Sequence, residues 1–268
     1  MTLEPCAAAL ALAASAVPAL AAPCLLAAEA ETVAVERALD GDTLALDDGR
    51  IVRLAGVAAP KAPLGVPAAE WSTDASSRTA LAALAAGKVL ELRTVEGSPD
   101  RHGRIVGYLS DIEGEDHAGL ASALLAKGLV RRTADRSGRD CDATLAAAEA
   151  GAIHARLGLW SQAYYAVREA SGGAALKASA GQFVVAEGRV ASFRTSAGRA
   201  YVNFGERWRD ALSLVIAEAT LRKLGGFGAL GIRVGARLRA RGVLEARLGP
   251  TIRVTEAAQI EPLDGRRP

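Results

Sequence analysis

Two aspartates, Asp40 and Asp42, lie on either side of Gly41 and begin a segment of the 268-residue chain that ends at Lys61. Aspartates beside a glycine are typical of a turn, in which their side chains accept hydrogen bonds from the backbone. Within the same segment, Arg53 stands in the apolar run IVRLAGV, where a guanidinium needs an anionic neighbour. These residues predict a charged turn and a contact between Arg53 and an anion.

A second group of charged residues lies near the C-terminus, and it is basic. Three arginines recur there at every second position: Arg237, Arg239 and Arg241. On a β-strand this spacing directs all three side chains to one face, with apolar residues on the other. Tyr201 and Trp208 lie in the aromatic and basic segment RAYVNFGERWRD. The pattern predicts either a charged groove with stacking rings for single-stranded nucleic acid or a solvated arginine face with Tyr201 and Phe204 in the core.

Positive charge is concentrated in the C-terminal third. The net charge is +2, but residues 182–268 contain 15 Lys+Arg against 8 Asp+Glu, whereas residues 32–181 contain 17 against 19. All but one of the cations in the C-terminal third are arginines, which suit planar, bidentate contacts with phosphate. Half of the residues are hydrophobic, so the composition is that of a globular protein, and the length favours two small domains over one large one.

The N-terminus resembles a secretory leader, which predicts export to the periplasm or the medium. An alanine-rich apolar run covers residues 7–26, and Ala28-Glu29-Ala30 is a small-x-small cleavage site, with Ala19-Leu20-Ala21 as an alternative. No basic residue precedes the run, however. Retention of residues 1–30 as a weak membrane anchor, with membrane contact in that case only, and a cytoplasmic location are the alternatives.

Cysteine usage indicates little. Cys6 and Cys24 lie in the predicted leader, so Cys141 is expected to stand alone in the mature chain, with no disulfide framework and no zinc spacing.

Residues 32–161 alternate in a way that predicts five strands and three helices. The strand-like segments are residues 32–39, 43–46, 50–57, 89–95 and 104–110, and the helical ones are residues 68–86, 120–127 and 144–157. Asp48-Gly49 predicts a hairpin between the second and third strands, and Gly87 predicts the end of the first helix. This order suggests a small closed barrel capped by helices, in a mainly β (α+β) chain.

The second half has its own set of strand-like segments. Residues 162–181 lack a sustained period and contain Gly172-Gly173, so they predict a linker or a short connecting helix. Residues 182–263 contain about five strands and a helix near residues 220–224, which predicts a second small barrel, basic and of the oligonucleotide-binding (OB) type.

Several motifs, taken in order, resemble the staphylococcal nuclease (thermonuclease) family. They are Asp40-Gly41-Asp42-Thr43, Arg53-Leu54 before Pro60, Asp100-Arg101-His102-Gly103-Arg104, LLAKGLV at 124–130 and GLW at 158–160. The resemblance covers residues 32 to about 161 and implies a five-stranded OB-type barrel with three helices. It also implies hydrolysis of DNA or RNA phosphodiesters with a calcium ion. The second half resembles barrels that are appended to some bacterial proteins of this kind.

The resemblance also implies roles for single residues. Arg53 and Arg104 take the positions of the two arginines that clamp the phosphodiester, where their donors can stabilise charge on its oxygens. The alternative is that Arg53 is a surface cation on a strand and Arg104 a turn residue. Asp42 takes the position of a calcium ligand, with Asp40 as a possible substitute, and the alternative for Asp42 is a turn former.

The chain departs from the family at three positions. The second carboxylate ligand falls on Ala58, the carbonyl ligand on Ala59, and the glutamate that activates water on Lys61. Calcium takes six to eight oxygens, so calcium is possible here but doubtful. The Lys61 ammonium could instead complete a phosphate pocket with Arg53 and Arg104, the alternative being a solvated loop lysine.

Three functions remain open at this point. The first is a divergent phosphodiesterase with a degenerate calcium site. The second is an inactive nucleic-acid-binding module that keeps the arginine pocket, with DNA or RNA, single-stranded in our expectation, as its partner. The third is a cell-envelope interaction protein that uses both domains as scaffolds. No particular protein partner follows from the sequence.

Overall fold

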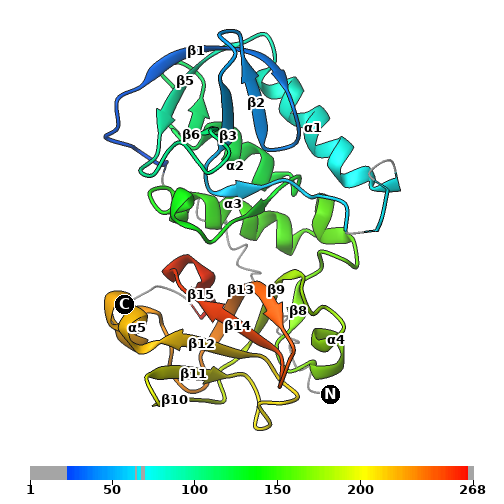
Figure 1. Cartoon of the computed structure of the whole chain (residues 1–268), viewed down its shortest axis with the longest axis vertical. Helices are drawn as coiled ribbons and strands as arrows, with labels where there is room; N and C mark the ends of the chain where they lie inside the picture. The colour runs from blue at the N-terminus through cyan, green and yellow to red at the C-terminus, as the bar shows by residue number, and fades with distance from the viewer. Residues whose placement is uncertain (1–22, 64, 68–69, 265–268) are drawn as a thin grey trace, which may run out of the picture.

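Five strands close into a barrel in the first half of the computed structural model, which describes residues 23–63, 65–67 and 70–264 (Figure 1). The strands are β1 (Glu31–Ala38), β2 (Thr43–Leu46), β3 (Ile51–Leu54), β5 (Val89–Thr94) and β6 (Ile105–Ser110). They pair in the order β1-β2-β3-β6-β5 and close through β1 and β5. Gly49 has a φ of 87° at the β2–β3 hairpin, which confirms the predicted turn. The predicted first barrel is confirmed.

Three helices cover this barrel, as the alternation of the sequence predicts. They are α1 (Ser72–Ala85), α2 (Gly119–Ala126) and α3 (Asp142–His154). The first was predicted from residue 68, and Ala68 and Ala69 lie outside the described residues. Buried leucines and valines from the strands and helices share one core, in which Leu44, Leu54 and Leu124 are fully enclosed. Strand β4 (Val57–Ala58), which belongs to the segment that ends at Lys61, pairs with the short strand β7 (Arg131–Arg132) after α2.

The second domain is a curved sheet of eight strands with a core of its own (Figure 1). Its strands are β8 (Arg168–Glu169), β9 (Phe183–Arg189), β10 (Ser192–Ser196), β11 (Arg199–Asn203), β12 (Ser213–Ala217), β13 (Arg237–Glu245), β14 (Thr251–Val254) and β15 (Ile260–Pro262). The pairing order is β10-β11-β12-β14-β13-β9-β8, with β15 on β13. This path does not close within the described residues, so the prediction of a second OB barrel is not confirmed. The long strand β13 pairs at one end with β9 and β15 and at the other with β14, because the chain bends at Gly242 (φ 154°).

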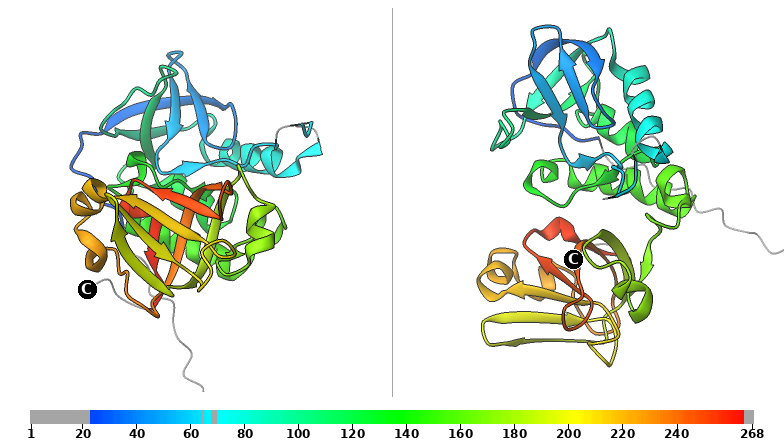
Figure 2. Two further views of the ribbon diagram at one scale, coloured as in Figure 1. Left: turned by 60° about the horizontal axis from the view of Figure 1, so that its bottom comes forward. Right: turned by 45° about the vertical axis from the view of Figure 1, so that its right-hand side comes forward.

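Short helices complete both domains. They are η2 (Arg136–Gly138), η3 (Gly158–Ser161), α4 (Gly173–Lys177), α5 (Glu218–Lys223), α6 (Gly226–Ala229) and η4 (Ala257–Gln259). Strand β8 and helix α4 fall in residues 162–181, so part of the predicted linker packs with the second domain. In Figure 1 helix α3 lies on the side of the first domain that faces the second, and the right-hand view of Figure 2 shows the two domains one above the other.

The described part of the N-terminal segment packs on the first domain through a disulfide. Cys24 and Cys141 are bonded, and both side chains lie in the core. The expectation that Cys141 stands alone is therefore wrong for the chain as given. It failed because it counted Cys24 as part of the leader, whereas the fold brings Cys24 to Cys141, 117 residues away. Most of the predicted leader, residues 1–22, lies outside the described residues. None of the helices in the described ranges is long and apolar enough to cross a bilayer.

Candidate functional site

Both aspartates of the turn that precedes β2 accept hydrogen bonds from backbone N–H groups. The backbone N–H of Asp42 donates to Asp40 Oδ1 at 2.9 Å, and the Asp42 side chain points into the domain. Its Oδ2 accepts from the backbone N–H of Ala59 at 2.6 Å, and its Oδ1 accepts from the Thr43 hydroxyl at 2.8 Å. Burial, and then the charge of Asp40, raise the pKa of Asp42. Asp42 therefore connects the turn to the chain that carries Ala58 and Ala59.

Lys61 lies against the other aspartate. Its Nζ is 2.8 Å from Asp40 Oδ2, and more than half of the lysine side chain is exposed. Burial acts to raise the pKa of Asp40, but the hydrogen bond from Lys61 and those from Asp42 outweigh it and lower that pKa. The structure thus brings Asp40, Asp42 and Lys61 together, with the ammonium as the counter-charge of the turn.

Arg53 lies at the centre of β3, beside this turn. Its cross-strand neighbours are Thr43 of β2 and Val106 of β6, and the N–H of Leu54 donates to the carbonyl of Asp42 at 2.8 Å. The half-buried guanidinium donates only to the carbonyl of Val57, at 3.3 Å. Among the described residues it has no ion pair. The anionic neighbour that the sequence predicts is therefore not supplied by these residues.

Arg104 precedes β6 and is held by its own loop. Its Nε donates to Asp100 Oδ2 at 2.9 Å, and its backbone N–H donates to Asp100 Oδ1 at 3.1 Å. Burial opposes ionisation of Asp100, but the contacts with Arg104 and with the His102 backbone prevail and lower its pKa to about 2. Because β3 and β6 are parallel neighbours, with Val52 beside Ile105, Arg104 lies at the start of the strand next to Arg53. A phosphate at this point would compete with Asp100 for Arg104.

Calcium does not fit the side chains of this turn. Both oxygens of Asp42 accept hydrogen bonds from the protein, and Asp40 pairs with an ammonium. No group of three or more His, Cys, Asp or Glu side chains that could hold a metal ion exists in the part of the chain that the structure describes. Hard cations need many oxygen ligands. Of the two aspartates of this turn, Asp42 is buried, and Lys61 contacts Asp40.

Sequence reasoning missed a residue that supports the loop of Lys61. The Tyr165 hydroxyl donates to the carbonyl of Lys61 at 3.4 Å and accepts from Trp71 Nε1 at 3.1 Å. Tyr164 packs edge-on against Trp71, with 5.2 Å between ring centroids. These rings connect the segment after η3 to the turn. No spacing in the sequence marks them as partners, because Tyr165 is 104 residues from Lys61.

The predicted arginine stripe does not form a nucleic-acid surface. Its three side chains do share one face of β13, with Leu238 and Ala240 in the core on the other, as predicted. That face, however, is covered by the first domain, so Arg239 is 6% exposed and Arg241 is fully buried. Arg237 remains exposed but pairs with Glu187 at 3.0 Å. The groove proposed for Arg239 and Arg241 is therefore wrong, because alternation indicates a shared face but not what covers it.

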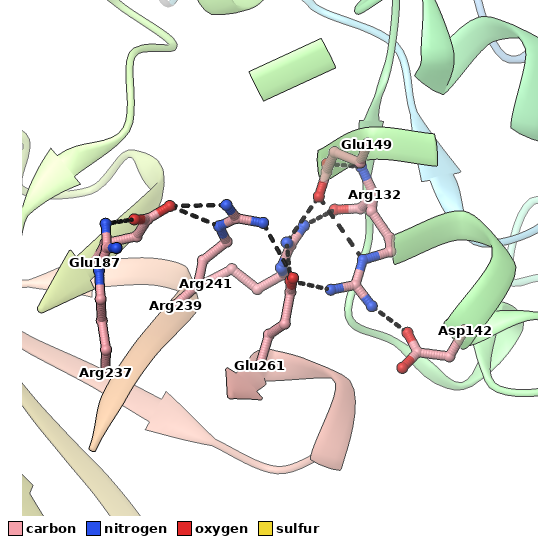
Figure 3. A network of polar contacts seen from close by, with 8 residues as sticks. All are labelled: Arg132, Asp142, Glu149, Glu187, Arg237, Arg239, Arg241 and Glu261. Atoms are coloured by element: carbon pink, nitrogen blue, oxygen red, sulfur yellow. Dashed lines mark hydrogen bonds and ion pairs between the residues drawn. The ribbon is translucent and has the colours of Figure 1, made fainter. Parts of the chain in front are cut away.

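Instead, the stripe joins the two domains through a network of charges (Figure 3). Four arginines and four carboxylates take part: Arg132, Arg237, Arg239, Arg241, Asp142, Glu149, Glu187 and Glu261. Arg241 Nη2 lies 2.7 Å from Glu149 Oε2 of α3 and 3.4 Å from Glu261 Oε2 of β15. From the first domain, Arg132 reaches Glu261 at 3.0 Å and also contacts Asp142. Each domain thus contributes an arginine and a carboxylate to the ion pairs that join the two domains.

The network is buried, and its charges depend on one another. Glu149 and Arg241 are 0% exposed and Arg132 is 1% exposed. Burial acts to raise the pKa of Glu149, but Arg241 and Arg132 outweigh it and hold that pKa below its ordinary value. Burial likewise acts against the charge of Arg241, which Glu149 restores, and the pKa of Arg241 rises. Burial of either charge would be costly without the counter-charges around it.

The two predicted aromatic residues lie elsewhere on the second domain. Tyr201 is half-buried on β11, with the guanidinium of Arg194 of β10 5.7 Å from its ring centre. Trp208 is 45% exposed in the β11–β12 loop, with Arg209 5.0 Å from its ring centre. Phe204 belongs to the core. Both ring–arginine pairs lie outside the interdomain network.

A hollow of about 740 Å³ also lies between the domains, away from the Asp40–Lys61 turn. Its charged walls include Arg136 and Arg139 from the first domain and Lys223 from the second. Glu256 pairs with both arginines, at 3.4 and 3.1 Å. These arginines already share a carboxylate, so the hollow is a weaker candidate than the surroundings of Arg53.

The comparison with protein families places the first domain. Residues 51–162 match the family model described as Staphylococcal nuclease homologue. The matched range includes Arg53, Lys61 and Arg104 and begins after Asp40 and Asp42. No curated protein was found to match the chain. The family resemblance of the sequence is confirmed over this range, and the closed barrel agrees with it.

We expect the interdomain pair Arg241–Glu149 to be strongly coupled in stability. Arg241→Met or Glu149→Leu alone should lower the free energy of unfolding by about 3–5 kcal/mol, because each removes the nearest counter-charge of a buried ion and leaves it only the longer contact with Arg132 or Glu261. The variant with both substitutions should lose less than either single variant. Urea unfolding of the four proteins gives the coupling energy. Arg253→Met with Glu245→Leu, at an exposed pair, is the matched control and should show a coupling of at most about 1 kcal/mol. Additive losses at the buried pair would contradict its place in the interface.

Proposed function

The first domain matches the staphylococcal nuclease family over residues 51–162, and from this premise we propose that the chain binds the phosphodiester backbone of nucleic acid without calcium. The phosphate contacts would come from Arg53, Arg104 and Lys61. Members of this family act on nucleic acids, so the substrate class follows from the domain. What we add is the mode of binding.

The observation that carries the proposal is the half-buried guanidinium of Arg53, which has no acidic partner among the described residues. A cation in this position is stabilised by an anionic ligand, and a guanidinium suits the paired oxygens of a phosphate. Lys61 adds an exposed ammonium beside the same turn, where one of its three donors faces Asp40. The positive charge that a metal would supply is then part of the chain.

Hydrolysis is the less favoured outcome. In-line attack of water on a phosphodiester needs a group that accepts a proton and one that stabilises the developing charge. Arg53 and Arg104 supply the second, but Lys61 stands where the resemblance expects the acid that activates water. We therefore propose binding without calcium-dependent cleavage, and a divergent hydrolysis is an outcome that the experiments below can detect.

We further propose that the second domain contributes a surface for single-stranded nucleic acid on β10 and β11. Arg194 and Tyr201 are cross-strand neighbours, and Arg199 is exposed on the same hairpin. A half-buried ring beside exposed arginines can stack a base while the cations meet the backbone. This surface replaces the stripe on β13, which the interface covers.

Export remains our proposal for the location of the protein. It is supported by the leader-like sequence of residues 7–26 and by the disulfide, since disulfides persist in oxidising compartments.

Arg53→Gln should weaken binding of a short phosphodiester, such as a dinucleotide, by about tenfold or more, because a charge-assisted contact contributes about 1.5–3 kcal/mol. The parent should bind equally well with calcium or with a chelator, and fluorescence anisotropy of a labelled dinucleotide measures both. Arg50→Gln is the matched control, since Arg50 lies at the hairpin tip and already pairs with Glu31 and Asp48. Binding that needs calcium, or that survives Arg53→Gln unchanged, would refute the proposal.

Ala58→Asp with Lys61→Glu should create a calcium site. The two substitutions add two anionic groups beside Asp40 and remove one cation, a local change of three charges. Calorimetry should show calcium binding that the parent lacks, and digestion of DNA and RNA should show whether cleavage follows. Ala58→Asn with Lys61→Gln has nearly the same shape without the charges and should not bind calcium. Efficient calcium-dependent cleavage by the parent would show that other groups complete the site.

Arg194→Ser with Arg199→Ser should weaken binding of single-stranded oligonucleotides by the full chain. Each lost phosphate contact should reduce the slope of log affinity against log salt by about 0.7, so the double variant should lose about 1.4. Arg222→Ser with Arg233→Ser removes the same charge elsewhere on the domain and serves as the control. Equal losses in the two double variants would indicate a general charge effect and would remove the β10–β11 surface.

A further inference from the structure

The chain from Cys24 to Leu26 is built into the first domain. The backbone N–H of Cys24 donates to Asp116 Oδ1 at 3.3 Å, and the carbonyl of Cys24 accepts from the N–H of His117 at 3.0 Å. The N–H of Leu26 donates to His117 Nδ1 at 2.7 Å. Cys24 is 5% exposed, and Leu26 packs against the same core. Three hydrogen bonds and the disulfide therefore hold a segment that precedes β1.

The domain supplies groups that match this segment, and among the described residues two of them, Cys141 and the Nδ1 atom of His117, bind only to it. Cys141 is 2% exposed in the core, beneath Cys24. The Nδ1 atom of His117 accepts only from Leu26. Removal of residues 24–26 would leave a buried thiol and these polar atoms without their partners, which costs stability. The predicted cleavage site Ala28-Glu29-Ala30 would remove them.

The same disulfide lies next to the interdomain network. Cys141 immediately precedes α3, whose first residue, Asp142, contacts Arg132 and whose Glu149 pairs with Arg241. The covalent bond thus fixes the start of the helix that carries two carboxylates of the network. Loss of Cys24 would therefore affect the helix whose carboxylates lie at the junction of the two domains.

We infer that the exported protein is cut between Ala21 and Ala22 and keeps Cys24, which is oxidised with Cys141 in the mature chain. Ala19 and Ala21 supply the small residues that a signal-peptidase-type enzyme needs before its cut. Cleavage adds one water across the Ala21–Ala22 peptide bond. Disulfide formation removes two electrons and two protons from the two thiols, and a protein or small-molecule disulfide accepts them and becomes a dithiol. This inference rests on the proposed export.

The test is the intact mass and N-terminal sequence of the protein made from the full-length gene and collected from the exported fraction. The protein is denatured with and without reductant in the presence of an alkylating agent. We expect a chain that begins at Ala22, with no alkylated thiol before reduction and two after it. Ala21→Leu should abolish this cut, whereas Ala30→Leu, at the downstream site, should leave it unchanged.

Each of the other possible results contradicts one particular claim. An exported chain that begins at Glu31 overturns the inference and leaves export intact. An exported chain that keeps residues 1–21 overturns the cut. Two alkylated thiols before reduction in an exported chain that begins at Ala22 overturn the disulfide. A full-length chain confined to the cytoplasmic fraction refutes export itself. Failure of the inference and failure of the proposed location are thus distinguishable.

Discussion

The buried ion pair between Arg241 and Glu149 is the constraint on which the arrangement of the two domains depends. Both side chains are fully buried and belong to different domains, so neither domain can present its surface to water without exposing half of the pair. Beside them, Arg132 of the first domain pairs with Glu261 of the second. Ion pairs of this kind add little net stability compared with apolar packing, but removal of one partner is costly. The network therefore specifies one relative placement of the domains more than it stabilises each of them.

That specificity has a consequence for nucleic-acid binding. The three arginines of β13 pair with three carboxylates, those of Glu149, Glu187 and Glu261. We propose that phosphate meets instead the positive charge near Arg53 on the first domain and near Arg194 on the second. A net positive charge counted from the sequence is thus a poor guide to a binding surface, because ion pairs remove cations from it. Arg53 is half-buried beside the Asp40 turn and has no acidic partner in the described residues.

The sequence predicts local structure well here because strands and turns are local. Alternation gives the five strands of the barrel, Asp48-Gly49 gives the hairpin, and the match with a nuclease family holds over residues 51–162. The failures are all long-range. The pairing of Cys24 with Cys141 spans 117 residues, and the contact of Arg241 with Glu149 joins two domains. The spacing of the β13 arginines correctly places them on one face, but only tertiary packing determines whether water, nucleic acid or another domain covers that face. Closure of the second barrel was not confirmed for a similar reason, because strand count does not determine how far a sheet curls.

In the turn at Asp40 a lysine is the counter-charge of the aspartates. Two carboxylates so close together repel each other, and the repulsion contributes to the raised pKa of Asp42. A divalent cation would offset it, and so does an ammonium. In this chain Ala58 stands where the resemblance implies a second carboxylate, and Lys61 supplies a cation that contacts Asp40. The two residues act in the same sense, because fewer acids need less neutralising charge and one lysine suffices. Asp42, fixed by the Ala59 N–H and the Thr43 hydroxyl, then serves to hold the turn in place. The counter-charge of the turn is consequently part of the chain, whereas in a metal site it would depend on the concentration of the ion.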